Sequence, residues 1–263
     1  MASNPPGKCC SIGVKHEGEA KGELKDIGNI NTYFSYPESR DTSHGILLLP
    51  DVLGQKFINV QLIADQFAAN GYFTVVPDLF EGDPVSLNPP EGFDIMKWLT
   101  TSGPSGGHTY KQVDPIVEAV IKEMKTNLGV KKLGSVGYCF GAKYVARFMT
   151  GGKGIDVGFM AHPSFVEEDE IKALTGPLSI AAAETDQIFP AEKRRATEDI
   201  LKGMKIPYQI SLYSDVEHGF AVRADVSKKP NKFAKEAAFL QAVAWFDEFL
   251  KGERSWAAPN SRL

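Results

Sequence analysis

The sequence has few cysteines and no long apolar run, and each absence excludes a class of protein. It contains 3 Cys in 263 residues, and Cys9 is adjacent to Cys10, so a disulfide framework of the secreted type is not expected. The first thirty residues contain no apolar stretch of signal-peptide length, and no segment approaches the roughly 20 apolar residues that span a bilayer. We therefore expect a cytoplasmic protein in a reducing setting, without membrane contact.

A block of basic residues is also missing, which argues against a nucleic-acid partner. Lys and Arg total 29 against 33 Asp and Glu, giving a formal net charge of −4, and no basic cluster is available to neutralise a phosphate backbone. With 43% hydrophobic and 24% charged residues, the composition is that of a globular protein with a large core.

Short apolar runs alternate with amphipathic segments from residue 44 onward, which is typical of crossover units on a parallel sheet. The strand-length runs are 44–49, 72–76, 133–138, 157–161, 178–183 and 208–213. Helical spacing follows at 60–69, 116–125, 142–149, 191–204 and 232–251. The pattern predicts an α/β fold, with a mostly parallel central sheet and helices on both faces.

Residues 1–251 are expected to form a single domain with two unusual segments. The first 36 residues are polar and Gly-rich, and we expect residues 8–36 to form an antiparallel hairpin on the sheet edge. Residues 82–110 are long for a plain connection and are a candidate lid or pocket wall. Residues 252–263 should be an exposed tail. Its end, Ser261-Arg262-Leu263, either resembles a Ser-Lys-Leu peroxisomal signal or is an ordinary soluble terminus.

The most informative stretch runs from Gly137 to Gly141 and has the pattern G-x-C-x-G between a strand and a helix. This is a nucleophile elbow with Cys139 in place of serine. The turn strains its central residue, and glycines are needed where any side chain would clash. Cys139 then lies at the positive end of the next helix, where a thiolate is favoured and the Phe140 amide faces a developing oxyanion. The alternative is a small buried thiol.

A nucleophile of this kind needs a base and an acid, which follow it in the order nucleophile, acid, base. His218 lies in a loop after the strand 208–213 and is the expected base. Asp186 follows the strand 178–183 and is the expected acid, because Glu184 lies nearer the strand end and has less reach.

The other histidines are assigned lesser roles. His162 follows the strand 157–161 and is expected in the pocket wall, with a structural histidine as the alternative. His16, His44 and His108 precede the elbow and are expected at the surface.

With Cys139, Asp186 and His218 in this order, the sequence resembles the dienelactone hydrolase family of α/β-hydrolases, whose triad is Cys-Asp-His. The similarity runs from about residue 30 to residue 250. The segment 77–80 resembles the family's post-strand turn, and 218–220 its histidine loop. The segments 7–10 and 16–18 resemble the eukaryotic, particularly the fungal, branch.

The resemblance also implies an oxyanion site and a pocket. Asp51 would contact the resting thiol, although bacterial members have Glu there, and the amides of Val52 and Phe140 would bind the oxyanion. Bacterial members carry an Arg after the post-strand turn, where this chain has Glu81-Gly82. The pocket residues that follow from the resemblance and from the strand ends are Phe80, His162, Phe220 and Arg223.

The sequence therefore predicts a cysteine-dependent hydrolase of a small ester or lactone that works through an acyl-enzyme. Alternatives are a thioesterase of secondary metabolism and a catalytically silent binding protein with the same fold. A nucleotide-binding domain is disfavoured, because no G-x-G-x-x-G or P-loop Lys follows an early strand. No cofactor is expected, and no metal, since Cys9-Cys10 lacks the spacing of a zinc site. The partner is a small ester, lactone or thioester, and a homodimer is one candidate assembly.

Overall fold

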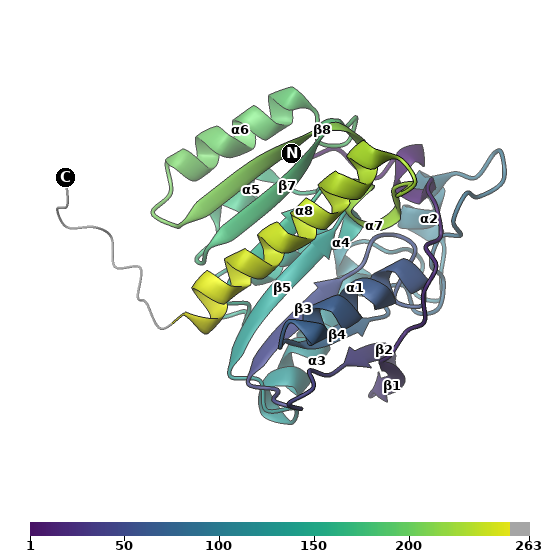
Figure 1. Cartoon of the computed structure of the whole chain (residues 1–263). Coiled ribbons are helices and arrows are strands. Elements are labelled where there is room, and N and C mark those ends of the chain that lie inside the picture. Colours follow the sequence, from purple (N-terminus) through teal and green to yellow (C-terminus); the bar gives the residue numbers. More distant parts are fainter. Residues whose placement is uncertain (253–263) are drawn as a thin grey trace, which may run out of the picture.

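The computed structural model describes residues 1–252, which form one eight-stranded sheet with helices on both faces (Figure 1). The strand order is β1-β2-β4-β3-β5-β6-β7-β8. The pairings β1–β2 and β2–β4 are antiparallel, and all later pairings are parallel. The predicted fold class is confirmed.

The bounds of the elements agree with most of the expected ranges. The strands are β1 (Glu23–Ile27), β2 (Ile30–Ser35), β3 (His44–Leu49), β4 (Phe73–Pro77), β5 (Lys132–Tyr138), β6 (Val157–Ala161), β7 (Leu178–Thr185) and β8 (Tyr208–Glu217). The helices are η1 (Lys8–Ser11), α1 (Ile58–Ala69), α2 (Ile95–Thr101), α3 (Tyr110–Thr126), α4 (Phe140–Phe148), α5 (Glu168–Lys172), α6 (Ala191–Lys202), α7 (Phe220–Arg223), α8 (Lys229–Phe246) and η2 (Asp247–Lys251).

The helix α3 begins earlier than its apolar spacing suggests. Thr109 precedes its first turn, and the Thr109 amide donates to the Gln112 side chain at 3.2 Å. This capping box satisfies backbone groups that the helix leaves unpaired at its start. The polar first turn of α3 therefore becomes helical although it contributes little to the core.

The sheet separates two apolar cores. On β3, Leu47 and Leu49 face one core, whereas Ile46 and Leu48 face the other, because side chains alternate along a strand. Both sets are fully buried, as expected for a strand covered on two sides. The helices α1 and α8 cover one face in Figure 1, and α3, α4 and α6 contribute to the core on the other.

The N-terminal segment differs from the expected hairpin. Only residues 23–35 pair as β1 and β2. Residues 1–22, which we call the N-terminal strap, run along the carboxyl edge of the sheet toward β1 (Figure 1). The Ser3 amide donates to Val166 O at 3.0 Å, and the Val14 amide donates to Arg223 O at 2.9 Å. The prediction for residues 8–22 is wrong because they contain no strand. The Val14 amide and the Ser11 carbonyl pair instead with Arg223 and Asn88, which are distant in the chain.

The segment 82–110 is packed against the body of the protein. It contains α2, whose Trp98 indole donates to the Asp83 carbonyl at 2.8 Å. The Trp98 ring also lies 5.1 Å from that of Phe80. Whether this segment acts as a lid or as a pocket wall stays a prediction. Of the expected tail only Gly252 is described, so the Ser261-Arg262-Leu263 tripeptide lies outside the described residues.

Within the described part of the chain, none of the helices combines the length and the hydrophobicity needed to cross a bilayer.

The elbow depends on a close approach between α4 and β3 that a side chain would prevent. A Cβ placed on Gly141 would lie 2.0 Å from the Leu49 carbonyl oxygen. We expect Gly141→Ala to lower the free energy of unfolding by about 3 kcal/mol or more, measured by urea denaturation. The matched control is Gly151→Ala, whose Cβ would meet no atom closer than Thr175 Cγ2 at 3.8 Å. An unchanged stability of Gly141→Ala would contradict the steric argument.

Candidate active site

Cys139 occupies the turn between β5 and α4 in a backbone conformation that few side chains adopt. Its dihedral angles are φ 50° and ψ −109°, so the turn stores strain of the kind found at functional sites. The Cys139 amide donates to the Ala161 carbonyl at 3.1 Å, and the Cys139 carbonyl accepts from the Ser164 amide at 3.0 Å. These bonds to the end of β6 and to the loop after it hold the turn in place.

The carboxyl ends of β7 and β8 bring the expected acid and base together. These strands are parallel neighbours, and Thr185 of β7 is in register with Glu217 of β8. The next residues along the chain are Asp186 and His218. His218 Nδ1 lies 2.9 Å from Asp186 Oδ2, and His218 Nε2 lies 3.1 Å from Cys139 Sγ. The three side chains thus form a continuous line from carboxylate to imidazole to sulfur.

The Asp186 carboxylate is fixed by backbone donors as well as by the histidine. Its Oδ1 accepts from the amides of Ile188 at 2.8 Å and Phe189 at 2.9 Å. Burial opposes protonation of His218, but Cys10 and Asp186 outweigh it and raise the pKa of His218. Since Nδ1 faces the carboxylate, Nε2 is left to accept a proton from sulfur.

Two backbone amides of the described residues lack a backbone acceptor. Phe140 is the first residue of α4, so its amide has no acceptor within the helix. Val52 follows β3 and is fully buried, and its amide donates to no backbone carbonyl that the structure describes. Both are the amides that the family resemblance assigned to the oxyanion.

Asp51 has partners that the resemblance did not suggest. Its Oδ2 lies 2.5 Å from Arg223 Nη1, and its Oδ1 accepts from the Leu53 amide at 3.0 Å. Both oxygens are therefore engaged away from the sulfur, and among the hydrogen bonds of the described residues none joins Asp51 to Cys139. The expected contact with the resting thiol is replaced by a buried ion pair.

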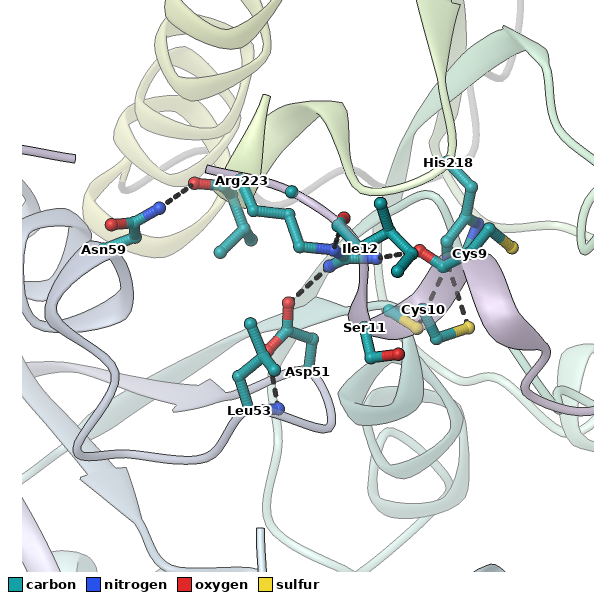
Figure 2. A network of polar contacts seen from close by, with 12 residues as sticks. Cys9, Cys10, Ser11, Ile12, Asp51, Leu53, Asn59, His218 and Arg223 are labelled. Carbon is teal, nitrogen blue, oxygen red and sulfur yellow. Dashed lines mark hydrogen bonds and ion pairs between the residues drawn. The ribbon is translucent and has the colours of Figure 1, made fainter. Parts of the chain in front are cut away.

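Arg223 joins that ion pair to the N-terminal strap. Its Nε donates to Ile12 O at 3.0 Å, and its Nη2 donates to Cys9 O at 3.1 Å. Figure 2 shows the guanidinium between the strap and Asp51. The side chain is only 1% exposed, and each of its three guanidinium nitrogens has an acceptor within the protein.

Cys10 is the site residue that the sequence reasoning did not find. Its Sγ lies 3.5 Å from His218 Nε2, and Figure 2 shows it pointing from the strap toward the imidazole. Contact with Cys139 and burial raise the pKa of the Cys10 thiol. Cys10 Sγ, Cys139 Sγ and His218 Nε2 all lie within 4.8 Å of one another and could hold a metal ion. The adjacent Cys9-Cys10 pair did not indicate this contact, because Cys10 comes close to His218 only when the chain is folded.

His162 and Phe220 lie beside the imidazole. The His162 ring centroid is 5.0 Å from that of His218 and 5.7 Å from that of Phe220. Neither ring nitrogen of His162 has a hydrogen-bond partner among the described residues. Burial, together with the charges of His218 and Arg223, lowers the pKa of His162 well below its usual value. The ring is therefore a neutral neighbour of the His218 imidazole.

Phe80 belongs to an aromatic cluster next to the elbow. Its ring lies 5.2 Å from Phe140 and 5.1 Å from Trp98. His108, expected at the surface, is buried in the same cluster, with its Nε2 3.0 Å from Asp83 Oδ2. That expectation is wrong because the 82–110 segment folds back and gives the imidazole both a polar partner and a stacking surface.

A cavity of about 430 Å³ opens between the strap and α7. Its lining includes Ile12, Val14, His218, Phe220 and Arg223. Cys139 is not among the lining residues and is fully buried. The cavity thus reaches His218 but not the thiol, which lies close to Cys10 of the strap.

Comparisons with known proteins agree with this architecture. Residues 30–250 match the model of the dienelactone hydrolase family. Hydrolase pyvD of Aspergillus violaceofuscus is 51% identical over 95% of this chain and 100% of its own length. Dienlactone hydrolase 1 of Gibberella moniliformis is 32% identical over 96% of this chain and 97% of its own.

A solved structure shows the same fold at low identity. A Klebsiella pneumoniae protein assigned as a dienelactone hydrolase superimposes with a TM-score of 0.72 at 16% identity, covering 87% of this chain and 98% of its own. The family resemblance inferred from the elbow and its partners is therefore confirmed. The chain belongs to the dienelactone hydrolase family of hydrolytic enzymes.

Proposed function

We propose that the protein hydrolyses a small carboxylic ester or lactone through an acyl-enzyme formed on Cys139. The observation that carries the proposal is the line of contacts from Asp186 through His218 to Cys139, with distances of 2.9 Å and 3.1 Å. A nucleophile, a base and an orienting acid in this order are what acyl transfer requires.

The first step is attack of the Cys139 sulfur on the substrate carbonyl. His218 Nε2 takes the thiol proton, and Asp186 stabilises the imidazolium that results. The negative charge moves to the carbonyl oxygen, where the amides of Phe140 and Val52 donate to it. As the C–O bond breaks, His218 returns the proton to the leaving oxygen, and a thioester to Cys139 is left.

The second step releases the acyl group. Water loses a proton to His218 and attacks the thioester carbonyl, and the same two amides bind the oxyanion again. The C–S bond then breaks, the acid leaves, and the proton returns to the sulfur. Loss of one oxyanion donor typically raises such a barrier by about 3 kcal/mol.

Substrate reaches the thiol only when the strap moves. Cys139 and Cys10 are both fully buried, whereas the cavity of about 430 Å³ is lined by His218 but not by either cysteine. Displacement of residues 9–12 would join that cavity to the nucleophile, and the carbonyls of Cys9 and Ile12 would then leave Arg223. A small substrate fits this space better than a polymeric one.

The relatives' names support the substrate class. Dienlactone hydrolase 1 of Gibberella moniliformis is named for a lactone, and a Xenopus tropicalis relative, 28% identical over 92% of this chain, is named a carboxymethylenebutenolidase homolog. Residues Glu81-Gly82 stand where bacterial members carry an arginine. This difference favours a substrate other than the dienelactone itself.

Replacing the nucleophile tests the covalent route. We expect Cys139→Ala to lower turnover of a p-nitrophenyl ester by about 10⁵-fold or more, since the acyl-enzyme can no longer form. The free energy of unfolding should change by about 1 kcal/mol or less. Cys9→Ala is the control and should keep the wild-type rate. Activity that persists in Cys139→Ala would refute the mechanism.

Replacing the acid tests whether it orients the base. In Asp186→Asn the carboxylate that holds His218 Nδ1 is lost, so we expect kcat to fall by about 10³- to 10⁴-fold. Glu184→Gln removes the acid near the end of β7, which is exposed and accepts from the Asp215 amide at 2.8 Å. This variant should stay within about two-fold of wild type. If the two variants lost activity equally, Asp186 would not be the orienting acid.

The acyl group can be identified by a panel of p-nitrophenyl esters, dienelactones and acyl thioesters. We expect esters or lactones of short acyl chains to give the highest kcat/KM, because the cavity beside His218 is small. A clear preference for thioesters would move the assignment to a thioesterase. No turnover of any substrate by a protein with a reduced Cys139 would favour a binding protein.

A further inference from the structure

The triad lies next to a third ligand atom that hydrolysis does not use. Cys10 Sγ is 3.5 Å from His218 Nε2, and Cys139 Sγ is 3.1 Å from the same nitrogen. All three atoms lie within 4.8 Å of one another. Two sulfurs and one imidazole nitrogen are the ligands that zinc prefers. We propose that Cys10, Cys139 and His218 form a Zn²⁺-binding site that reversibly blocks the nucleophile.

The spacing of the three atoms fits a tetrahedral ion. With Zn–S near 2.3 Å and Zn–N near 2.0 Å, ligand atoms of one tetrahedron lie about 3.5 to 3.8 Å apart. The two measured separations from His218 Nε2 are 3.1 Å and 3.5 Å. Small side-chain shifts therefore suffice to admit the ion. The fourth position is left for water or a small solute, as in zinc sites that are not purely structural.

The imidazole is already held in the orientation that a metal requires. His218 Nδ1 lies 2.9 Å from Asp186 Oδ2, so Nε2 directs its lone pair toward both sulfurs. Zinc-bound histidines almost always donate their second ring nitrogen to a carboxylate or carbonyl, which fixes the tautomer. The carboxylate that serves catalysis would thus also serve as the outer partner of a metal ligand.

The charges of the bound ion and its two thiolate ligands balance within the buried site. Binding forms two Zn–S bonds and one Zn–N bond and releases two thiol protons to solvent, with no change of oxidation state. The two thiolates neutralise the dication, which matters because Cys10 and Cys139 are both fully buried. The buried Asp186 carboxylate keeps its bonds from His218 Nδ1 and from the amides of Ile188 and Phe189. Arg223 and Asp51 form a separate buried ion pair.

The ligands come from separate parts of the chain, which makes the site conditional on the strap. Cys10 and His218 are 208 positions apart, and Cys10 reaches the imidazole only while the strap is closed. A bound ion would therefore hold the strap shut as well as occupy the sulfur. Removal of the ion by a chelator would free both.

Cobalt binding to the full-length protein tests the site directly. Metal-free protein is titrated with Co²⁺, whose thiolate charge-transfer and tetrahedral visible bands report the ligand set, and Zn²⁺ is then added in competition. We expect one ion per chain, with an affinity that Cys10→Ser lowers by about 100-fold or more. Cys9→Ser, which alters the neighbouring sulfur outside the cluster, should bind as wild type does.

Inhibition is measured separately from binding. Ester turnover with Zn²⁺ is divided by the metal-free turnover of the same variant, so that any effect of Cys10→Ser on the basal rate cancels. We expect this ratio to fall with Zn²⁺ in wild type and in Cys9→Ser, to remain near one in Cys10→Ser, and to recover with a chelator. The spectral titration remains informative even if no ester proves to be a substrate.

Two results of the metal titration would overturn the proposal. Failure of wild type to bind Co²⁺ or Zn²⁺ one-to-one, or equal binding by Cys10→Ser, would refute the site. If Cys10→Ser fails to fold, X-ray absorption of the zinc-loaded wild type decides the question. Two sulfurs and at least one nitrogen around the ion support the site, whereas an oxygen-rich shell or a single sulfur contradicts it.

Discussion

The close contact between the start of α4 and the end of β3 is the constraint from which the site follows. The Leu49 carbonyl leaves no room for a side chain on Gly141, so the chain can turn from β5 into α4 only with glycine there. Cys139 is then forced to φ 50°, and its sulfur is lifted to the carboxyl edge of the sheet. A strained residue of this kind persists only where the surrounding structure is well packed, and the buried strands on both sides of β5 supply that packing.

Parallel pairing brings the other two side chains of the proposed triad to the same edge. The register of Thr185 with Glu217 sets Asp186 beside His218, because each follows its strand by one position. The bonds between Cys139 and the end of β6 connect the elbow to the neighbouring strand. Backbone hydrogen bonds thereby fix the positions of Asp186, His218 and Cys139, which are distant in the sequence.

The strap packs against the proposed triad. Arg223 is the centre of this arrangement, since its guanidinium bridges Asp51 and two strap carbonyls in a fully buried place. Removal of one partner from such a pair leaves an uncompensated buried charge and is strongly destabilising. The Asp51–Arg223 pair therefore keeps the guanidinium in place for its bonds to the strap. The same packing places the Cys10 sulfur 3.5 Å from His218 Nε2, where the proposed zinc ion would find its ligands.

The sequence by itself determined the elements that depend on local pattern. The alternation of apolar runs predicted the parallel sheet, G-x-C-x-G located the turn at Cys139, and strand ends pointed to Asp186 and His218. These features can be predicted because each depends on residues that are close together in the chain.

Only the tertiary structure decided the course of the strap, the partner of Asp51 and the burial of His108. Residues 8–22 lack a hydrophobic period, so nothing in their order shows that their amides and carbonyls would pair with Arg223 or that Cys10 would meet His218. Such contacts join groups about 200 positions apart, and their free energy depends on excluding water from a finished core. No local pattern in the sequence can therefore predict these long-range contacts.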